Sequence, residues 1–359
     1  MAGRSGRSIS STQPGAQGAS GCYYVGMKNN TKLYETAAAL LATGKGILAA
    51  DESDGTAGKR LDQVHLENTP ENRQDFREIL FTAPDIEQYI SGVIMYDSSI
   101  RNTTDDGTPF TDVLISKGII PGIKVDTGVN DHEGFKGEVV TQGLDGLADR
   151  LSEYYSMGAR FAKWRMVVTI DGDETPTYET VKMNCIMMTR YAQLCQAAGI
   201  VPIVEPEVIH AGDHSLQKAE IETTRTLQIL FQTLQEYRVD LAGLILKSSM
   251  VLAGDKYPEQ TSAAEVAQAT LRTFHMSVPH EIAGIVFLSG GQSSERSTQN
   301  LNAIAQLGQQ PWPITFSFSR ALENPVLDAW GGKPENVDAA KAALLEVARV
   351  NSVASLGQM

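Results

Sequence analysis

Short apolar runs recur along the chain, and they constrain its fold more than any other feature of the sequence. A strand that is apolar on both faces is normally buried on both, as in parallel sheets covered by helices. Eight such runs are present, and we predict a strand from each: Gly46–Asp51, Tyr89–Asp97, Ile119–Asp126, Phe161–Val168, Ile200–Val208, Leu241–Met250, Gly284–Gly291 and Pro313–Arg320.

Helical patterns separate most of these runs. In residues 144–157, for example, apolar residues recur at three- and four-residue steps and keep one face of a helix apolar. Strands that alternate with long helices predict a parallel sheet, and eight repeats favour its closure into a single (β/α)8 TIM barrel of the α/β class. We predict helices at Thr36–Thr43, Leu144–Met157, Tyr178–Ala198, Leu216–Tyr237, Ala263–Phe274 and Thr298–Leu307.

An open, doubly wound sheet is the alternative arrangement of alternating strands and helices. It is disfavoured because no G-x-G-x-x-G motif follows the first apolar run. We expect extra N-terminal helices after Asp51 and a C-terminal tail from Asn336 as additions to the barrel. The 359 residues fit one barrel with insertions, without a second domain.

The first 22 residues differ in composition from the rest of the chain. They are rich in glycine and serine, contain Arg4 and Arg7, and lack both acidic residues and an apolar core. We predict a disordered tail at residues 1–22, followed by the barrel domain at residues 23–359. An organelle transit peptide is the alternative, since such peptides are also rich in arginine and serine.

Charge and cysteine content narrow the partners and the compartment. The net charge of −13 argues against a nucleic-acid partner, and no apolar segment approaches the ~18 residues of a membrane span. Three cysteines, Cys22, Cys185 and Cys195, make a poor disulfide framework and indicate reduced thiols in a cytoplasmic protein. An anionic substrate therefore needs cations placed locally to bind it.

A lysine stands near the end of the apolar run at 241–250. Side chains alternate along a strand, so Lys247 is expected to share a face with Ile245 and Gly243. Burial favours the neutral amine, which is a nucleophile for Schiff-base chemistry. The alternative is a lysine whose ammonium group reaches solvent beyond the strand end.

Charged residues and glycines stand at the ends of the other predicted strands. Several alternate with large apolar residues, so solvated charges at a loop edge are the weaker interpretation. Cations at one barrel mouth indicate a phosphorylated substrate, and an amine among acids indicates carbonyl chemistry through an iminium ion. Because barrel enzymes build their sites at the carboxyl ends of the strands, the candidates are Asp51, Lys124, Asp126, Lys163, Arg165, Glu205, Glu207, Ser289, Gly290, Gly291 and Arg320.

Six motifs on these strands resemble class I fructose-bisphosphate aldolases. They are GILAADES (46–53), PGIKVD (121–126), RFAKWR (160–165), VPIVEPE (201–207), FLSGGQS (287–293) and the Arg320-Ala321-Leu322 turn. The resemblance implies reversible cleavage of fructose 1,6-bisphosphate to dihydroxyacetone phosphate and glyceraldehyde 3-phosphate, in glycolysis and gluconeogenesis. It also implies a homotetramer and no metal cofactor, because a protonated imine on lysine accepts the electrons of the broken bond.

The resemblance implies a catalytic role for five residues. Lys247 is similar to the lysine that forms the Schiff base with the substrate ketone, and Glu205 to the acid and base that dehydrates the carbinolamine. Glu207 is similar to an assisting carboxylate beside Lys247. Asp51 resembles the base that takes the C4 hydroxyl proton, and Lys163 the lysine that supports carbinolamine formation.

The resemblance also implies residues for three parts of the substrate pocket. These are the C1-phosphate site, with Ser289, Gly290 and Arg320; the loop of the C6 phosphate, with Ser53, Thr56 and Lys59; and two lining cations, Lys124 and Arg165.

Three places depart from the family pattern. The chain ends LGQM at 356–359, where many members end in a tyrosine that helps to exchange the enamine proton. Ser248-Ser249 follows Lys247, where proline is common first, and Phe318-Ser319 replaces a frequent Tyr-Gly pair. None of these departures removes a catalytic group, but they bear on turnover and substrate range.

Three other functions fit parts of the sequence. Metal catalysis would use His210 and His214, but they lie in a loop pattern without a third evident ligand. A transaldolase-like Schiff-base enzyme would keep Lys247 without needing cations for two phosphates. A binding or scaffold role could accompany catalysis, but an idle protein would not need Glu205 or Lys163 beside that lysine.

Overall fold

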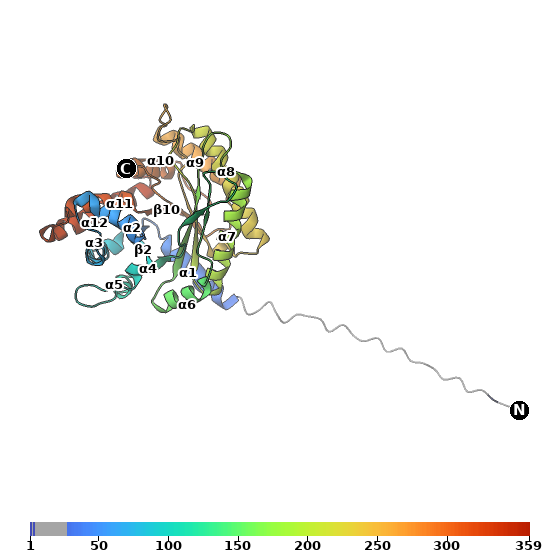
Figure 1. Ribbon diagram of the computed structural model, residues 1–359, viewed down its shortest axis with the longest axis horizontal. Helices are drawn as coiled ribbons and strands as arrows, with labels where there is room; N and C mark the ends of the chain where they lie inside the picture. The colour runs from blue at the N-terminus through green and yellow to red at the C-terminus, as the bar shows by residue number, and fades with distance from the viewer. Residues whose placement is uncertain (2, 4–26) are drawn as a thin grey trace.

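The computed structural model describes Met1, Gly3 and residues 27–359 (Figure 1). Apart from Met1 and Gly3, the predicted tail at residues 1–22 lies outside the described residues, and so does Cys22. The predicted domain boundary at residue 23 therefore stays a prediction.

Eight parallel strands form a closed barrel within the described part of the chain, in the order β1, β10, β9, β8, β7, β6, β3 and β2. The predicted (β/α)8 barrel is confirmed. The open sheet is wrong, because the first strand pairs in parallel with both the second strand and the last. The strands are β1 (Gly46–Ala50), β2 (Ile90–Met95), β3 (Ile120–Lys124), β6 (Phe161–Val168), β7 (Val201–Val208), β8 (Ile245–Ser248), β9 (Gly284–Phe287) and β10 (Ile314–Phe318).

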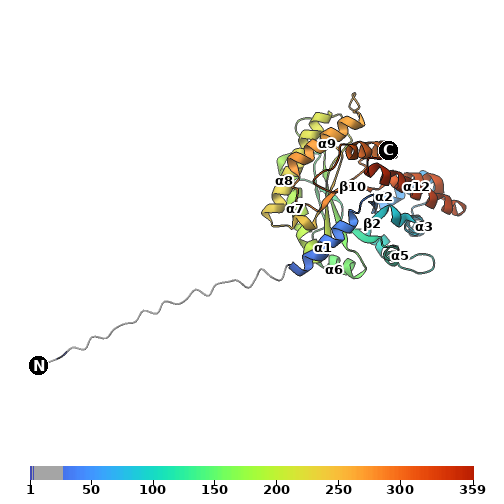
Figure 2. The same ribbon diagram turned by 180° about the vertical axis from the view of Figure 1, so that it is seen from behind.

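Helices surround the barrel, as Figures 1 and 2 show from opposite sides. Consecutive helices pack on one another from α7 to α12. The helices are α1 (Met27–Leu40), α2 (Asp54–Leu61), α3 (Pro70–Thr82), α4 (Asp97–Ile100), α5 (Phe110–Ser116), α6 (Leu147–Ser156), α7 (Tyr178–Ala197), α8 (Leu216–Glu236), α9 (Ala263–Ser277), α10 (Ser294–Gln306), α11 (Arg320–Trp330) and α12 (Val337–Ser355).

Two hydrophobic cores fill the molecule, one between the strands and the outer helices and one inside the barrel. The inner core combines strand residues such as Phe161 with Leu33 and Leu40 from α1. Leu40 lies against Gly92, near the start of β2, so α1 packs at the amino ends of the strands. Since apolar side chains fill that end, the charged residues are left to the carboxyl ends.

The run at 241–250 contains a shorter strand than the sequence predicts. Leu241–Gly243 forms a 3-10 helix, which begins where the Asp240 carboxylate accepts a hydrogen bond from the backbone N–H of Ala242. The strand itself is Ile245–Ser248, so Gly243 does not share its inner face. Ile245 belongs to the inner core, and Lys247 lies two residues further along the same face.

Three further elements differ from the predictions. The expected C-terminal tail is the helix α12, which packs on α10 and α11. Thr298 at α10 donates a hydrogen bond to the Asn351 amide oxygen of α12 at 2.9 Å. The short antiparallel hairpin of β4 (Val129–Asp131) and β5 (Val139–Thr141) was not predicted.

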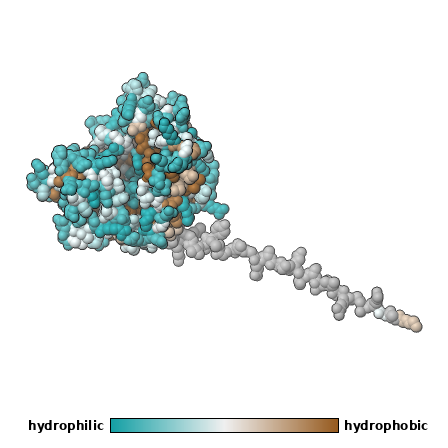
Figure 3. Space-filling view, in the orientation of Figure 1, coloured by the Kyte–Doolittle hydropathy of each residue, from teal (hydrophilic) through white to brown (hydrophobic). Residues whose placement is uncertain are grey.

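The surface gives no sign of a membrane-spanning helix. Across residues 27–359, no helix combines the length and the apolar character needed to cross a bilayer. Figure 3 shows a face on which hydrophilic residues predominate and hydrophobic ones form limited patches.

The contact between Gly122 and Phe161 gives a stability prediction for the barrel. The two residues are paired across β3 and β6, and a Cβ atom at Gly122 would lie 2.3 Å from the Phe161 ring. We expect Gly122→Ala to lower the free energy of unfolding by about 1–3 kcal/mol, because the ring must move within a packed core.

Urea denaturation of the full chain measures this change. Gly55→Ala in α2 is the matched control, because a Cβ atom there meets nothing within 4 Å. An unaffected Gly122→Ala variant would contradict the packing described for the barrel interior.

Candidate active site

A cavity of about 620 Å³ opens at the carboxyl ends of the strands. All the residues predicted for the site except Gly291 line this cavity, although they come from seven strands or the segments that follow them. They are Asp51, Ser53, Thr56, Lys59, Lys124, Asp126, Lys163, Arg165, Glu205, Glu207, Lys247, Ser289, Gly290 and Arg320.

A row of alternating charges lies at the floor of this cavity. Lys247 Nζ is 3.2 Å from Glu205 Oε1, and Lys163 Nζ is 3.0 Å from Glu205 Oε2. Lys163 Nζ is also 2.7 Å from Asp51 Oδ2. All four side chains are buried, with no more than 10% of any one exposed. Two cations and two anions thus compensate one another away from solvent.

The pairing keeps both members of the central ion pair charged. Burial alone would raise the pKa of Glu205, but the Lys163 and Lys247 ammonium groups and the Arg165 guanidinium lower it to about 2. Burial alone would lower the pKa of Lys163, but the Asp51 and Glu205 carboxylates raise it well above its usual range. Lys163 is therefore held as a cation, which disqualifies it as a nucleophile.

Lys247 differs from Lys163 in having one carboxylate partner instead of two. Its contact with Glu205 is also the longest of the three. Of the two buried lysines, Lys247 is thus the one with fewer ionic partners, and it lies beside the Glu205 carboxylate.

Glu207 lies two residues beyond Glu205 on β7, and its carboxylate makes a different pairing. It accepts a hydrogen bond from Arg165 Nε on the neighbouring strand. Burial alone would lower the pKa of Arg165, but Glu207 raises it above its usual value. The contact expected from the resemblance was with Lys247, whereas the structure pairs Glu207 with Arg165.

Lys124, at the end of β3, is paired with Asp126, which follows it by two residues. Its ammonium group contacts both the carbonyl and the carboxylate of Asp126. The second Asp126 oxygen accepts a hydrogen bond from the backbone N–H of Arg165 at 3.2 Å. Asp126 thus links the ends of β3 and β6. Its position two residues after Lys124 could have indicated that the two side chains lie on the same face.

One group of anion-binding candidates lies between β9 and α11. Gly290 and Gly291 have φ of 58° and 86°, which favours glycine and makes a tight turn after β9. A Cβ atom at Gly291 would lie 3.8 Å from Arg320 Nη2, so the guanidinium reaches this turn. Arg320 makes no ion pair with any described residue, and burial lowers its pKa below the usual value. Such a guanidinium is available to an incoming anion.

A second group lies at the start of α2. Ser53 and Thr56 hydroxyl groups are 3.1 Å apart, and Ser53 makes no capping bond to the helix. Lys59 lies one turn further along the same helix and also faces the cavity. The two groups, on α2 and around α11, can hold two anionic ends of one substrate.

Several further residues line the cavity without having been predicted. Among them are Glu52, Arg60, Gln63, Tyr96 and Ser319. Glu52 and Arg60 pair with each other, and each also contacts a residue further away in the sequence, Arg77 for Glu52 and Asn324 for Arg60.

The histidines of the metal hypothesis do not line this cavity. His210 and His214 are in the loop after β7, and burial lowers the pKa of each. In the part of the chain that the structure describes, no three His, Cys, Asp or Glu side chains are grouped as a metal site requires.

The lowered pKa of Glu205 predicts a pH-dependent contribution to stability. The ionised carboxylate stabilises the fold above its ordinary value of 4.5, and this contribution is lost as the pH falls toward about 2. We expect Glu205→Gln to be less stable than the wild type at neutral pH, and the difference to shrink over that acid range.

Urea denaturation at a series of pH values measures the difference in unfolding free energy. Glu259→Gln, at an exposed position, is the control and should track the wild type throughout. A stability difference for Glu205→Gln that does not change with pH would contradict the ion pairing described above.

Comparisons with known proteins identify the family of this chain. A family model described as class-I fructose-bisphosphate aldolase matches residues 32–359. The probable fructose-bisphosphate aldolase class 1 of Xanthomonas campestris is 48% identical over 91% of this chain and 98% of its own length. Fructose-bisphosphate aldolase 2 of Caenorhabditis elegans is 47% identical over 91% and 89%.

A solved structure shares the same fold. It is a fructose-bisphosphate aldolase from Plasmodium falciparum, determined in complex with TRAP and a small-molecule inhibitor. It superposes with a TM-score of 0.91 at 44% identity, over 92% of this chain and 96% of that one. From the near-complete family match and these identities, the chain belongs to the class I fructose-bisphosphate aldolases, a family of lyases.

Proposed function

We propose that the enzyme cleaves fructose 1,6-bisphosphate reversibly into dihydroxyacetone phosphate and glyceraldehyde 3-phosphate through a Schiff base on Lys247. The observation that carries this proposal is the buried contact between Lys247 and Glu205, with Lys163 on the other side of that carboxylate. An amine next to a carboxylate that is held ionised has a proton acceptor within reach.

Schiff-base formation follows from this pair. Glu205 takes a proton from the Lys247 ammonium, and the free amine attacks the substrate ketone to give a carbinolamine. Glu205, now protonated, returns a proton to the carbinolamine hydroxyl, and water leaves. Lys163, held as a cation, stabilises negative charge as it develops in the site.

Carbon–carbon cleavage needs a second base. We assign this role to Asp51, whose carboxylate is held 2.7 Å from Lys163 Nζ. Asp51 removes the C4 hydroxyl proton, the C3–C4 bond breaks, and its electrons pass into the iminium ion on Lys247. Glyceraldehyde 3-phosphate leaves, and protonation and hydrolysis of the enamine release dihydroxyacetone phosphate.

The cavity supports a substrate with two phosphates. We assign the C1 phosphate to Ser289, Gly290 and Arg320, and the C6 phosphate to the α2 residues Ser53, Thr56 and Lys59. A volume of about 620 Å³ is in the usual range for a small-ligand site. Two anion-binding groups argue against a transaldolase-like enzyme, which has no use for both.

We further propose that the enzyme needs no metal and acts as a homotetramer in the cytoplasm, in glycolysis and gluconeogenesis. The names of two plant relatives support the location, since one from Arabidopsis thaliana is called cytosolic and one from Pisum sativum cytoplasmic. A scaffold role alongside catalysis is compatible with this proposal.

Loss of the nucleophile gives the first test. We expect Lys247→Met to lower kcat for fructose 1,6-bisphosphate by roughly 10⁴-fold or more, because the covalent route is closed. Lys333→Met, at an exposed position, is the control and should keep the wild-type rate. Cleavage by the Lys247→Met variant at more than a few per cent of the wild-type rate would overturn the assignment.

Metal removal gives the second test. We expect extensive dialysis against EDTA to leave kcat unchanged, because the iminium ion replaces the Lewis acid. Activity lost on dialysis and restored by Zn²⁺ would show that the chemistry depends on a metal.

A further inference from the structure

A closed ring of hydrogen bonds borders the substrate cavity. Its members are Glu52, Arg77, Ser319 and Glu323, from the segment after β1, from α3 and from the start of α11. Arg77 donates from Nη1 to Glu323 Oε1 at 3.0 Å and from Nη2 to Glu52 Oε2 at 2.5 Å. The Ser319 hydroxyl is 2.6 Å from Glu52 Oε1 and 3.2 Å from Glu323 Oε2. The four groups thus use all four carboxyl oxygens.

The hydrogen bonds of the ring indicate which of its two carboxyl groups is protonated. The Ser319 hydroxyl has one proton, and its shorter contact is with Glu52, so it donates there. The 3.2 Å contact with Glu323 is a weak share of the same hydroxyl proton if Glu323 is ionised, and a full hydrogen bond from Glu323 to the hydroxyl oxygen if Glu323 is protonated. The ring therefore closes with full hydrogen bonds when Glu52 is a carboxylate and Glu323 is a neutral acid.

The pKa shifts of the two carboxyl groups also favour a proton on Glu323 and a charge on Glu52. Burial raises the pKa of Glu323 well above its usual range, and the Glu52 carboxylate raises it further, against opposing effects of Arg77 and Arg60. Burial alone would also raise the pKa of Glu52, but Arg77 and its other donors lower it well below the usual value. The two carboxyl groups thus carry one proton between them.

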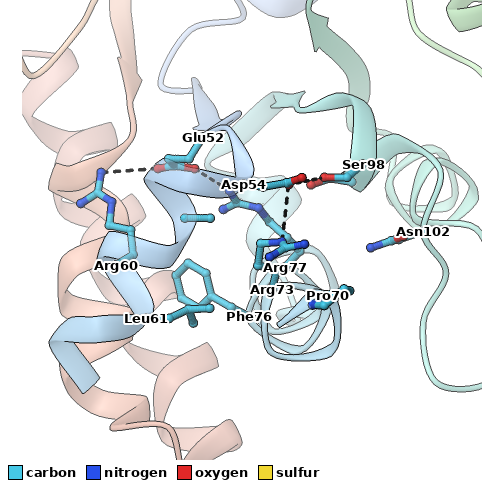
Figure 4. Close-up of a pocket in the computed structure, with 12 residues that line it drawn as sticks. Glu52, Asp54, Arg60, Leu61, Pro70, Arg73, Phe76, Arg77, Ser98 and Asn102 are labelled. Carbon is cyan, nitrogen blue, oxygen red and sulfur yellow. Dashed lines mark hydrogen bonds and ion pairs between the residues drawn. The ribbon is translucent and has the colours of Figure 1, made fainter. Parts of the chain in front are cut away.

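Arg60 extends the ring toward the second anion-binding group. It contacts Glu52 at 3.4 Å and donates to the Asn324 amide oxygen at 3.0 Å. Figure 4 shows Glu52 between Arg60 and Arg77, beside a small cavity of about 70 Å³ behind α2. The ring and Arg60 together connect α2, α3 and α11.

The ring is adjacent in sequence to two residues assigned to the reaction. Ser319 precedes Arg320, and Glu52 follows Asp51. Ser319 stands at the N-terminus of α11, where a serine hydroxyl commonly caps the helix. Here the side chain makes no capping bond, so its hydroxyl belongs to the ring. The position of the Arg320 backbone thus depends on a bond to Glu52.

We propose that Glu323, as a neutral acid in this ring, is a positioning residue that sets Arg320 for the substrate phosphate. The proposal rests on the function proposed above, in which Arg320 binds the C1 phosphate. Glu323 has none of its side chain exposed, so it cannot touch the substrate itself. Its effect must pass through Ser319 and the first turn of α11.

Three variants separate the donor role of Glu323 from its charge. Glu323→Gln keeps an N–H donor and a carbonyl acceptor of similar shape, whereas Glu323→Leu removes both. Ser319→Ala removes the bridging hydroxyl. We expect the leucine and alanine variants to raise KM for fructose 1,6-bisphosphate about tenfold, because each breaks hydrogen bonds to charged groups. The kcat of Glu323→Leu should change little, because Glu323 is buried away from the cavity, and the glutamine variant should keep the wild-type KM.

The pH profile of KM adds a measurement that packing alone does not affect. Because the pKa of Glu323 is raised by burial and by the Glu52 carboxylate, its neutral form persists to higher pH than that of an exposed glutamate and is lost as the pH rises further. The charged groups that act on it are Glu52, Arg77 and Arg60, and Asp51 acts in turn on Arg77. We expect KM of the wild type to rise at alkaline pH relative to that of Glu323→Gln, whose amide does not titrate.

Steady-state kinetics and phosphate binding, both measured on the full-length chain, test the positioning role of Glu323. The proposal is overturned if KM stays within about twofold of wild type in Ser319→Ala and Glu323→Leu, or if the glutamine variant is as impaired as the leucine one. It is also overturned if kcat and melting temperature fall while KM does not change. If the leucine variant does not fold, Ser319→Ala and Glu323→Gln carry the test.

A control keeps this test separate from the proposed function. Failure of the wild type to cleave fructose 1,6-bisphosphate would refute that function. Calorimetric binding of inorganic phosphate would still test the ring, since the affinity should fall in Ser319→Ala and persist in Glu323→Gln. Equal phosphate affinities in all variants would overturn the positioning role.

Discussion

The active site depends on the position of Lys163 between Asp51 and Glu205. Two carboxylates this deeply buried remain ionised only if a cation lies close to both, and the Lys163 ammonium is 2.7 and 3.0 Å from them. A buried charge without a partner costs several kcal/mol. The three residues come from different strand ends, so the cluster forms only when the barrel has closed.

The barrel also decides where such a cluster can lie. Apolar residues of α1 and of the strand starts fill the amino end of the barrel, which leaves the carboxyl ends for charged groups. There the cations are concentrated in an acidic protein of net charge −13. An anionic substrate is therefore attracted to one cavity rather than to the surface in general.

Most of the fold could be predicted because its signals are local. Apolar runs alternating with amphipathic helices define a parallel barrel, and residues two apart on a strand face the same way. For this reason every predicted site residue except Gly291 lines one cavity. The apolar run at 241–250 predicts one strand because Leu241–Gly243 is also apolar. In the structure, Asp240 caps a 3-10 helix at these three residues.

The features that sequence reasoning missed depend on contacts between distant residues. Arg77 pairs with Glu52, which is 25 residues away in the chain, and with Glu323, which is 246 residues away. Nothing in the pattern around any of them indicates that the others are close. Likewise, the pairing of Glu207 with Arg165 rather than Lys247 depends on the tilt of side chains between neighbouring strands.

The central claim is that Lys247, and not the equally buried Lys163, is the nucleophile. Borohydride reduction of the enzyme with dihydroxyacetone phosphate, followed by mass mapping of its peptides, tests this claim most directly. The account predicts one reduced adduct, on Lys247. An adduct on Lys163, or the absence of any adduct, would contradict it.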